Sequence, residues 1–237
     1  MLRGGVTSSS ISIIDNQCTK FYRCGFETLG KRSVVIGMSP GNGYFSKENM
    51  IDIIAGMCEI SPKVYIVVPD TPHIHNFTAV GYNWAKSKKK AKKDNNQTNN
   101  RLRYAADILK TELNIQNFEI FDWELEVESN SDYKASVEVV MNAYRTNSEF
   151  QHLVNTLTYQ YLESRAFTRT INELVISEGV KYYLKELALF TVLKSVFNEH
   201  PIIAYYKKWG EGLEFIEQLF EGFADQFGMI QYKLDSE

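Results

Sequence analysis

Short apolar runs alternate with longer amphipathic segments in the first half of the chain. Runs rich in β-branched and aromatic residues, which predict strands, occupy residues 33–38, 63–68 and 118–121. Apolar residues at helical spacing predict helices over 46–57, with Ser46 as the N-cap, and over 77–113. Strands that alternate with helices favour an α/β fold with a Rossmann-like parallel sheet flanked by helices, whose ligands bind at the C-terminal ends of the strands.

The pattern of the second half is mainly helical. Apolar spacing predicts helices over residues 131–146, 149–167, 177–197 and 211–226. A strand is expected over 202–206, and the closing segment 229–234 alternates like an edge strand. No repeat or linker interrupts the pattern, so we expect one domain over 1–237, with 1–30 as a partly ordered N-terminal extension. The Asn-rich stretch 94–100 is a weak helix former and predicts a break or fraying in the long helix.

Composition adds an expected cellular setting. The chain has 237 residues, and its 44% hydrophobic content is enough for the core of one α/β domain. The N-terminus lacks the apolar segment of a signal peptide, and no apolar run approaches the roughly 20 residues that span a bilayer. Three cysteines, Cys18, Cys24 and Cys58, form neither an even disulfide set nor a metal-type cluster. We therefore expect a cytoplasmic protein with reduced thiols and no membrane partner.

Positive charge is concentrated in one segment. Residues 86–103 hold eight Lys and Arg and one Asp, which gives this segment a net charge of +7. The net charge of the whole chain is −3, so the remaining residues carry −10. On a continuous helix, one face would carry Lys86, Lys90, Lys93, Gln97 and Arg101. Such a stripe suits phosphates and would make binding salt-dependent, which predicts a polyanionic partner. A solvated lysine-rich helix is the alternative.

A serine stands where the first buried strand turns into a helix. Residues 37–41, Gly-Met-Ser-Pro-Gly, match the G-x-S-x-G nucleophile elbow, so the hydroxyl of Ser39 is expected at the sheet edge, poised for acyl chemistry. A serine esterase of the α/β-hydrolase type also needs a histidine base. The candidates His152, in a helical pattern, and His200, before Pro201, do not follow a late strand in the expected way. The esterase interpretation therefore lacks its base.

Two further patterns are candidates for chemistry. Tyr182 and Glu186 are four residues apart, which places a phenol and a carboxylate on one face of a largely apolar helix. A surface pair between Glu186 and a neighbouring lysine is the alternative. Tyr205 ends a predicted strand, where a side chain can project into a cleft or serve only the core. The pair His73 and His75 is a weak metal signal, and no phosphate-binding glycine motif is present, so we expect no metal and no cofactor.

These elements, in this order, resemble the cyclodipeptide synthases, which use two aminoacyl-tRNAs to make a 2,5-diketopiperazine. The resemblance extends from about Ser33 to Leu234. It implies a ping-pong reaction with Ser39 as the acyl-accepting nucleophile, in a loop whose characteristic asparagine is Asn42. The other residues that it implies are the amino-group ligands Tyr182 and Glu186, the proton-transfer residue Tyr205 and a further active-site tyrosine, Tyr133.

The resemblance also implies substrates and fold. It implies a catalytic domain similar to that of the class I tyrosyl- and tryptophanyl-tRNA synthetases, working as a monomer, with a tailoring enzyme downstream. Gly37, Val67 and Ile203 would line the first aminoacyl pocket, which favours an apolar side chain, and Arg165 would lie near the second pocket. The tRNA would dock on Lys86, Lys89, Lys90, Lys93, Arg101 and Arg103.

The sequence departs from the family pattern at two places. Tyr206 follows Tyr205 where one subfamily carries Gln or His, and stretch 94–100 replaces part of an Arg-rich helix, which favours a lysine-based docking surface. An aminoacyl-tRNA ester is already activated, so Ser39 would need no histidine, and amides of the following turn would stabilise the oxyanion. A tRNA-binding Rossmann module without catalysis is the remaining alternative.

Overall fold

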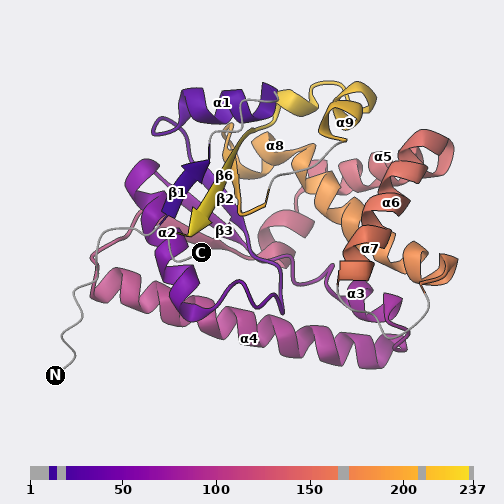
Figure 1. Ribbon diagram of the computed structural model, residues 1–237, viewed down its shortest axis with the longest axis horizontal. Helices are drawn as coiled ribbons and strands as arrows, with labels where there is room; N and C mark the ends of the chain where they lie inside the picture. Colours follow the sequence, from indigo (N-terminus) through magenta and orange to yellow (C-terminus); the bar gives the residue numbers. More distant parts are fainter. Residues whose placement is uncertain (1–10, 15–19, 165–170, 208–211, 235–237) are drawn as a thin grey trace.

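The computed structural model describes residues 11–14, 20–164, 171–207 and 212–234, which build one six-stranded sheet with helices on both faces (Figure 1). The strand order is β1-β6-β5-β2-β3-β4. The strands are β1 (Ile11–Ile14), β2 (Val34–Gly37), β3 (Val64–Val67), β4 (Phe118–Phe121), β5 (Ile202–Tyr205) and β6 (Gly228–Leu234). Strands β6, β5, β2, β3 and β4 are parallel, and β1 pairs with β6 in the antiparallel sense. The predicted α/β fold with a largely parallel sheet is confirmed.

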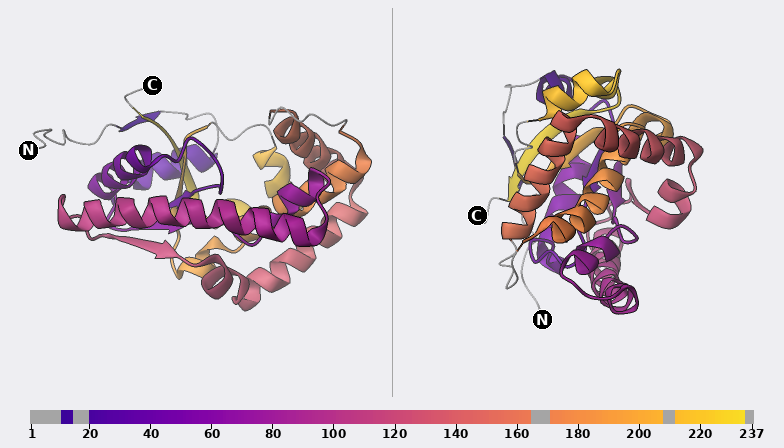
Figure 2. Two further views of the ribbon diagram at one scale, coloured as in Figure 1. Left: turned by 90° about the horizontal axis from the view of Figure 1, so that it is seen from below. Right: turned by 90° about the vertical axis from the view of Figure 1, so that its right-hand side faces the viewer.

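Helices of very different length cover the sheet (Figures 1 and 2). They are α1 (Lys20–Thr28), α2 (Lys47–Ile60), α3 (Ile74–Ala79), α4 (Trp84–Thr111), α5 (Ser131–Thr146), α6 (Ser148–Ser164), α7 (Glu173–Phe190), α8 (Leu193–Phe197) and α9 (Leu213–Leu219). A π-helical turn, η1 (Trp123–Glu128), follows β4, and a 3-10 turn, η2 (Phe223–Asp225), follows α9. Among the described helices, none is long and apolar enough to cross a membrane.

Two apolar cores lie on opposite faces of the sheet because successive strand residues point to opposite sides. On β2, Val34 and Ile36 belong to the core that α2 and α4 cover. Val35 belongs to the second core, which α1 and the helices from α5 onward complete. Both faces of β2, β3 and β5 are therefore buried, which explains the continuous apolar runs that predicted these strands.

The edge of the sheet differs from the prediction. Segment 229–234 belongs to β6, which is not an edge strand, because β1 pairs along its free side. The side chains of β6 are buried on both faces apart from Lys233 and the half-exposed Gln231, so its partial alternation reflects two polar residues and not a solvated face. Part of the expected N-terminal extension thus contributes a strand, and α1 packs beside β6.

The long polar helix is continuous, and the predicted break at 94–100 is wrong. Helix α4 runs for 28 residues, about 42 Å at 1.5 Å per residue. It begins at Trp84 and not at residue 77, because Ile74–Ala79 forms the separate helix α3 and Gly81 turns the chain with φ +84°. Within the weak stretch, Thr98 is 3% exposed and Asp94 is half-buried, so tertiary contacts override the low helix propensity.

The other predicted helices are present with shifted ends, except that two of them are divided. The segment expected at 211–226 is the short helix α9 and the 3-10 turn η2, because Gly222 turns the chain between them with φ +75°. Segment 131–146 matches α5, and 149–167 corresponds to α6, whose described part ends at Ser164. The segment expected at 177–197 is two helices, α7 and α8, because α7 ends at Phe190. Ser46 caps α2 as predicted: its hydroxyl accepts a hydrogen bond of 3.1 Å from the amide of Asn49.

Candidate active site

A cavity of about 350 Å³ opens where β2, β3 and β5 end, between the sheet and helices α6 and α7. We call it the Ser39 cavity. Most of its wall is apolar, and its polar groups come from a few residues. The predicted residues that line it are Ser39, Tyr182, Glu186, Tyr205, Gly37, Val67 and Ile203. Three strand ends and one helix thus bring together residues from 37 to 205 of the chain.

The position of Ser39 follows from the way β2 ends. The amide of Met38 still donates to the carbonyl of Val67 at 2.8 Å, so the sheet pairing continues to the residue before the serine. The chain then turns at Gly41, whose φ is +70°, and α2 begins after Ser46. The predicted strand–turn–helix arrangement is therefore present, with the half-exposed Ser39 at the cavity.

A chain of hydrogen bonds leads from Ser39 into α7. The Ser39 hydroxyl donates to the Tyr182 phenol, and the phenol donates to the Glu186 carboxylate at 2.7 Å. The neighbouring lysines bind other carboxylates: Lys181 pairs with Glu178, and Lys185 lies 3.6 Å from Glu128. The alternative of a surface pair between Glu186 and a lysine is therefore wrong.

Burial sets the charge states of Tyr182 and Glu186. Desolvation raises the pKa of Glu186 to about 7, although the hydrogen bond from Tyr182 partly opposes the shift. Desolvation, followed by the nearby charge of Glu186, raises the pKa of Tyr182 well above its usual value, so the phenol stays a neutral donor. Near neutral pH, the Glu186 carboxyl is divided between its two forms, and a cation in the cavity favours the charged one.

Asn42 shapes the loop and does not line the cavity. Its side-chain amide donates to the Tyr206 hydroxyl at 3.0 Å, and its side-chain oxygen accepts from the amide of Tyr44 at 3.1 Å. The rings of Tyr44 and Tyr206 stack with centroids 4.1 Å apart. Tyr206, which the sequence presents only as a departure from a family pattern, therefore anchors the Ser39 loop to the end of β5.

Tyr133 lies behind the cavity wall. It is 3% exposed, its hydroxyl donates to the carbonyl of Lys185 at 3.3 Å, and its ring meets Trp123 edge to face. Burial raises its pKa far above the usual value. The structure thus places Tyr133 against Trp123, which does line the cavity. Arg165 falls outside the described residues.

The sequence analysis missed part of the cavity wall. Trp123 lines the cavity from η1, directly after β4, and the position after a strand end was a usable signal for it. Tyr161 and Thr158 line the cavity from α6, where helical periodicity does not separate cavity-facing from core-facing positions. Their discovery needed the tertiary structure.

The turn after Ser39 offers fewer free amides than expected. Amides that donate to acceptors inside the protein belong to Gly41, Asn42, Tyr44 and Phe45. Pro40 has no N–H group. The expected oxyanion donors of this turn are therefore reduced to the amides of Ser39 and Gly43, for which no acceptor is found among the described residues.

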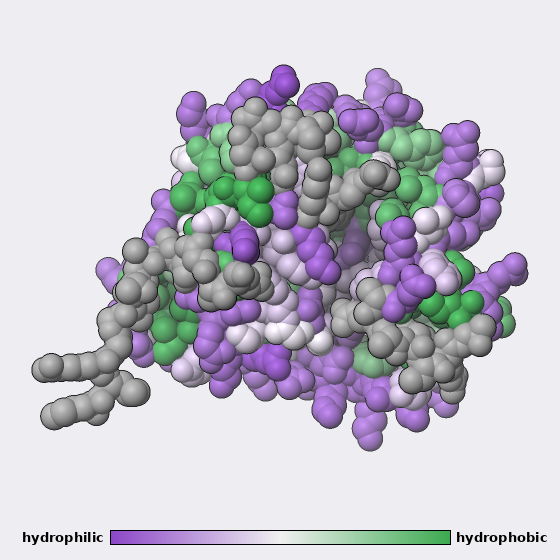
Figure 3. Space-filling model, viewed as in Figure 1, coloured by the Kyte–Doolittle hydropathy of each residue, from purple (hydrophilic) through white to green (hydrophobic). Residues whose placement is uncertain are grey.

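The basic residues of α4 form an exposed surface beside the cavity-bearing part of the molecule. In Figure 3, hydrophilic residues dominate the lower edge, where Figure 1 places α4. The predicted docking residues Lys86, Lys89, Lys90, Lys93 and Arg103 are exposed or half-exposed, and so are Lys88 and Lys92. Arg101 differs, because its guanidinium donates to the carbonyl of Phe45 at 3.4 Å. The continuous helix therefore presents the predicted stripe, but Arg101 also contacts the segment that follows Ser39.

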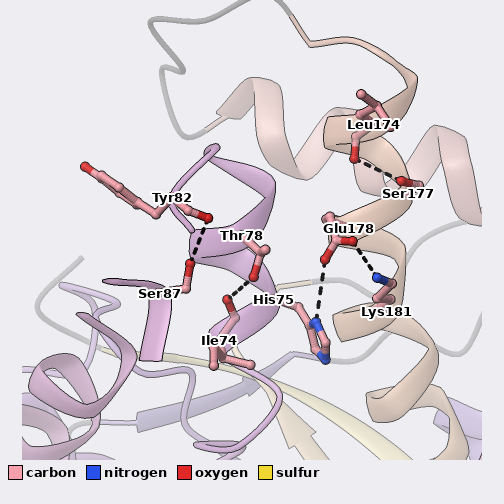
Figure 4. A network of polar contacts seen from close by, with 9 residues as sticks. All are labelled: Ile74, His75, Thr78, Tyr82, Ser87, Leu174, Ser177, Glu178 and Lys181. Carbon is pink, nitrogen blue, oxygen red and sulfur yellow. Dashed lines mark hydrogen bonds and ion pairs between the residues drawn. The ribbon is translucent and has the colours of Figure 1, made fainter. Parts of the chain in front are cut away.

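None of the four histidines lines the cavity. His73 lies with its Nε2 3.3 Å from Asp94, and His75 extends from α3 toward Glu178 on α7, 3.9 Å away (Figure 4). Desolvation lowers the pKa of His75 to about 4. His152 lines a shallow depression with Phe215 on the outside of α6, and the carbonyl of His200 accepts from Arg32. No cluster of three metal-ligand side chains occurs in the described residues.

Comparison with known proteins assigns this geometry to a family. The profile of the cyclodipeptide synthase family matches residues 23–224. The cyclodipeptide synthase of Bacillus thermoamylovorans is similar in fold, with a TM-score of 0.76 and 20% identity over 94% of this chain and 95% of that chain. A Mycobacterium tuberculosis protein, whose structure relates cyclodipeptide synthetases to type I tRNA synthetases, has a TM-score of 0.72 and 16% identity over 97% and 96%.

A third similar structure was solved with tRNA. The cyclodipeptide synthase of Candidatus Glomeribacter gigasporarum, bound to Phe-tRNAPhe, has a TM-score of 0.60 and 19% identity over 85% of this chain and 87% of that chain. No curated protein sequence matches the chain significantly. Because the family profile covers most of the 237 residues and the whole fold agrees with it, the chain belongs to the cyclodipeptide synthase family.

Proposed function

We propose that this protein joins the aminoacyl groups of two aminoacyl-tRNAs into a cyclic dipeptide, with Ser39 as a covalent acyl carrier. The observation that carries the proposal is the hydrogen-bonded chain of Ser39, Tyr182 and Glu186 in an apolar cavity. A serine without a histidine suits a substrate that is already an activated ester, because little additional activation is needed.

In the first step, the Ser39 oxygen attacks the carbonyl carbon of the first aminoacyl-tRNA ester. The bond from that carbon to the ribose oxygen breaks, and the departing ribose hydroxyl takes up the proton that the serine loses. The amides of Ser39 and Gly43 are the donors of the turn that remain for the oxyanion. The aminoacyl group is then held on the enzyme as a serine ester.

Glu186 and Tyr182 bind the α-amino group of this ester. A buried carboxylate needs a cationic partner, and the α-ammonium group supplies one, since the neighbouring Lys181 and Lys185 pair with other carboxylates. The amine must be neutral to attack the second ester, so it has to lose a proton on the way. A carboxyl group whose pKa lies at about 7 can accept that proton near neutral pH.

The second half of the reaction uses the same serine. The neutral amine attacks the ester of the second aminoacyl-tRNA, the tRNA leaves, and a dipeptidyl-enzyme forms. The amine of this dipeptide then attacks the Ser39 ester carbonyl, which closes the six-membered ring and returns the proton to the serine oxygen. Tyr205 would shuttle this proton, and its half-exposed position in the cavity lining at the end of β5 supports that role. Tyr133 supports this site from behind Trp123.

Apolar amino acids suit the first aminoacyl pocket. Gly37, Val67 and Ile203 are small or aliphatic and line the cavity wall at the ends of β2, β3 and β5. Discrimination by one methylene is only about 1–3 kcal/mol, so several related products are expected. Arg165 remains our candidate for the second pocket. The tRNA would dock on the α4 lysines, and the enzyme would act as a cytoplasmic monomer that supplies a tailoring enzyme.

The test is a reaction of the purified protein with charged tRNAs, followed by mass spectrometry of small products and of the intact protein. Diketopiperazines and an aminoacyl adduct at Ser39 are expected. Ser39→Ala should abolish both, whereas Asn99→Ala, on α4 and away from the cavity, should retain both. Persistence of products in Ser39→Ala would refute the covalent route, and ester hydrolysis without diketopiperazine would favour the esterase alternative.

A further inference from the structure

The middle of α4 is built against the loop that carries Ser39. Figure 1 shows the segment after β2 lying directly above this helix. The amide of Gly41 donates to the Thr98 hydroxyl at 3.3 Å, and the guanidinium of Arg101 donates to the carbonyl of Phe45 at 3.4 Å. Thr98 is 3% exposed, so its hydroxyl is a buried acceptor that is satisfied by the loop.

Asp94 restricts which residue type can occupy position 41 of the Ser39 loop. A Cβ atom on Gly41 would lie 2.8 Å from the Asp94 carboxylate, and the φ of +70° at Gly41 is itself unfavourable for other residues. Asp94 is held in place from the other side by His73, whose Nε2 lies 3.3 Å from it, while Asn76 contacts the second ring nitrogen at 3.2 Å. The carboxylate thus forms a fixed support beneath the turn.

The same stretch of α4 holds a second loop of the cavity. The side-chain amide of Asn95 donates to the carbonyl of Asp70 at 3.0 Å, directly after Pro69, which lines the cavity. Residues that weaken a helix intrinsically are therefore the ones that hold the loops after β2 and β3. Their polar side chains serve the loops and not the helix.

We propose that α4 positions the Ser39 loop for acyl transfer, with Thr98 and Asp94 as positioning residues. The inference rests on the proposed function, since it assigns these residues to the loop of the nucleophile. One side of the helix would bind the tRNA through lysines, and another side would fix the turn in which Ser39 lies. Displacement of a reacting group by about 1 Å can cost about a hundredfold in rate, which gives such positioning a measurable effect.

The test compares Thr98→Val with Thr98→Ser, and Asp94→Ala with Lys93→Gln. Valine keeps the shape of threonine but leaves the Gly41 amide without its acceptor, so kcat should fall about tenfold with an unchanged KM for aminoacyl-tRNA. Serine keeps the acceptor and should stay within about twofold of the parent protein. Asp94→Ala should also lower kcat. Lys93→Gln, exposed and adjacent to Asp94, should raise KM and leave kcat unchanged.

Hydrogen exchange separates this inference from the proposed function. In Thr98→Val, the amide of Gly41 should exchange at least about tenfold faster, whereas amides of the distant β6 should not change; this readout needs no catalysis. An unchanged kcat in both Thr98→Val and Asp94→Ala, or unchanged exchange at Gly41, would overturn the positioning role. Absence of an adduct at Ser39 in the parent protein would instead refute the proposed function.

Discussion

Glu186 should make the protein less stable as pH rises, and Glu186→Gln should remove this effect. The carboxyl group has a pKa of about 7 in the folded chain, against about 4.3 for an unperturbed glutamate. The folded state thus holds the proton more tightly than the unfolded state, so stability is greatest below the unfolded pKa and is lost as pH rises to about 7. At 1.36 kcal/mol for each unit, the full effect is about 4 kcal/mol.

His75 titrates over the same pH range as Glu186 but changes the stability of the protein in the opposite direction. Its pKa is lowered to about 4 by burial, so the folded state resists protonation. Stability from this group is present above about pH 6.5 and is lost as pH falls toward 4. The two effects nearly cancel in the parent protein. Only a comparison between variants can therefore isolate either group.

The assay is urea unfolding of the parent protein, Glu186→Gln and His75→Gln at pH 5 and pH 8.5. The stability of Glu186→Gln relative to the parent should increase by about 2–3 kcal/mol from the lower pH to the higher one. His75→Gln should change in the opposite direction. At pH 8.5, Glu186→Gln should also be nearly inactive, because glutamine cannot neutralise the α-ammonium group of the substrate.

A pH-independent difference between Glu186→Gln and the parent protein would refute the reasoning. It would mean that the carboxyl group is not desolvated in the way the cavity requires. We expect Glu186→Gln to be more stable and less active than the parent protein at high pH, because the buried charge lowers stability but is needed for activity.

Three further outcomes follow from the structure. Replacing Lys86, Lys90 and Lys93 by Gln should raise KM for aminoacyl-tRNA and reduce the slope of log affinity against log salt by about 2–3, measured by filter binding; an unchanged slope would contradict docking on α4. Ser46→Ala should cost about 1 kcal/mol in urea unfolding, because the N-cap acceptor of α2 is lost; a cost of zero would show that the cap is dispensable. Gly37→Val should shift the products, measured by mass spectrometry, toward smaller amino acids, since no atom lies within 4 Å of an added Cβ and the branched side chain can extend into the cavity. The same product profile as the parent would remove Gly37 from the first pocket.

The local pattern of the chain predicted most of the elements around the site. The β-branched runs of β2 and β3 are buried on both faces. Such strands can be predicted from the sequence because they form continuous apolar runs. The Ser39 turn was readable because glycine, proline and asparagine end a strand there. The pair Tyr182 and Glu186 was readable because residues four apart on a helix share a face.

Tertiary contacts decided what local pattern could not. Propensity predicts a broken helix at 94–100, yet Thr98 binds the amide of Gly41 in the Ser39 loop and Asp94 contacts His73. Such contacts outweigh a few tenths of a kcal/mol of propensity for each residue. The alternation of β6 did not reveal that β1 covers its edge, because strand pairing joins residues more than 200 positions apart.

The sequence by itself determined the residue types, the strand–turn–helix around Ser39, the phenol–carboxylate pair and the basic stripe, because each depends on neighbours within a few positions. Only the tertiary structure decided that Glu186 is desolvated and linked through Tyr182 to Ser39, and that no histidine lines the cavity. It also decided that the lysine-bearing helix holds the serine loop. Burial and long-range contact fix charge states and orientations, and neither is a property of a short stretch of chain.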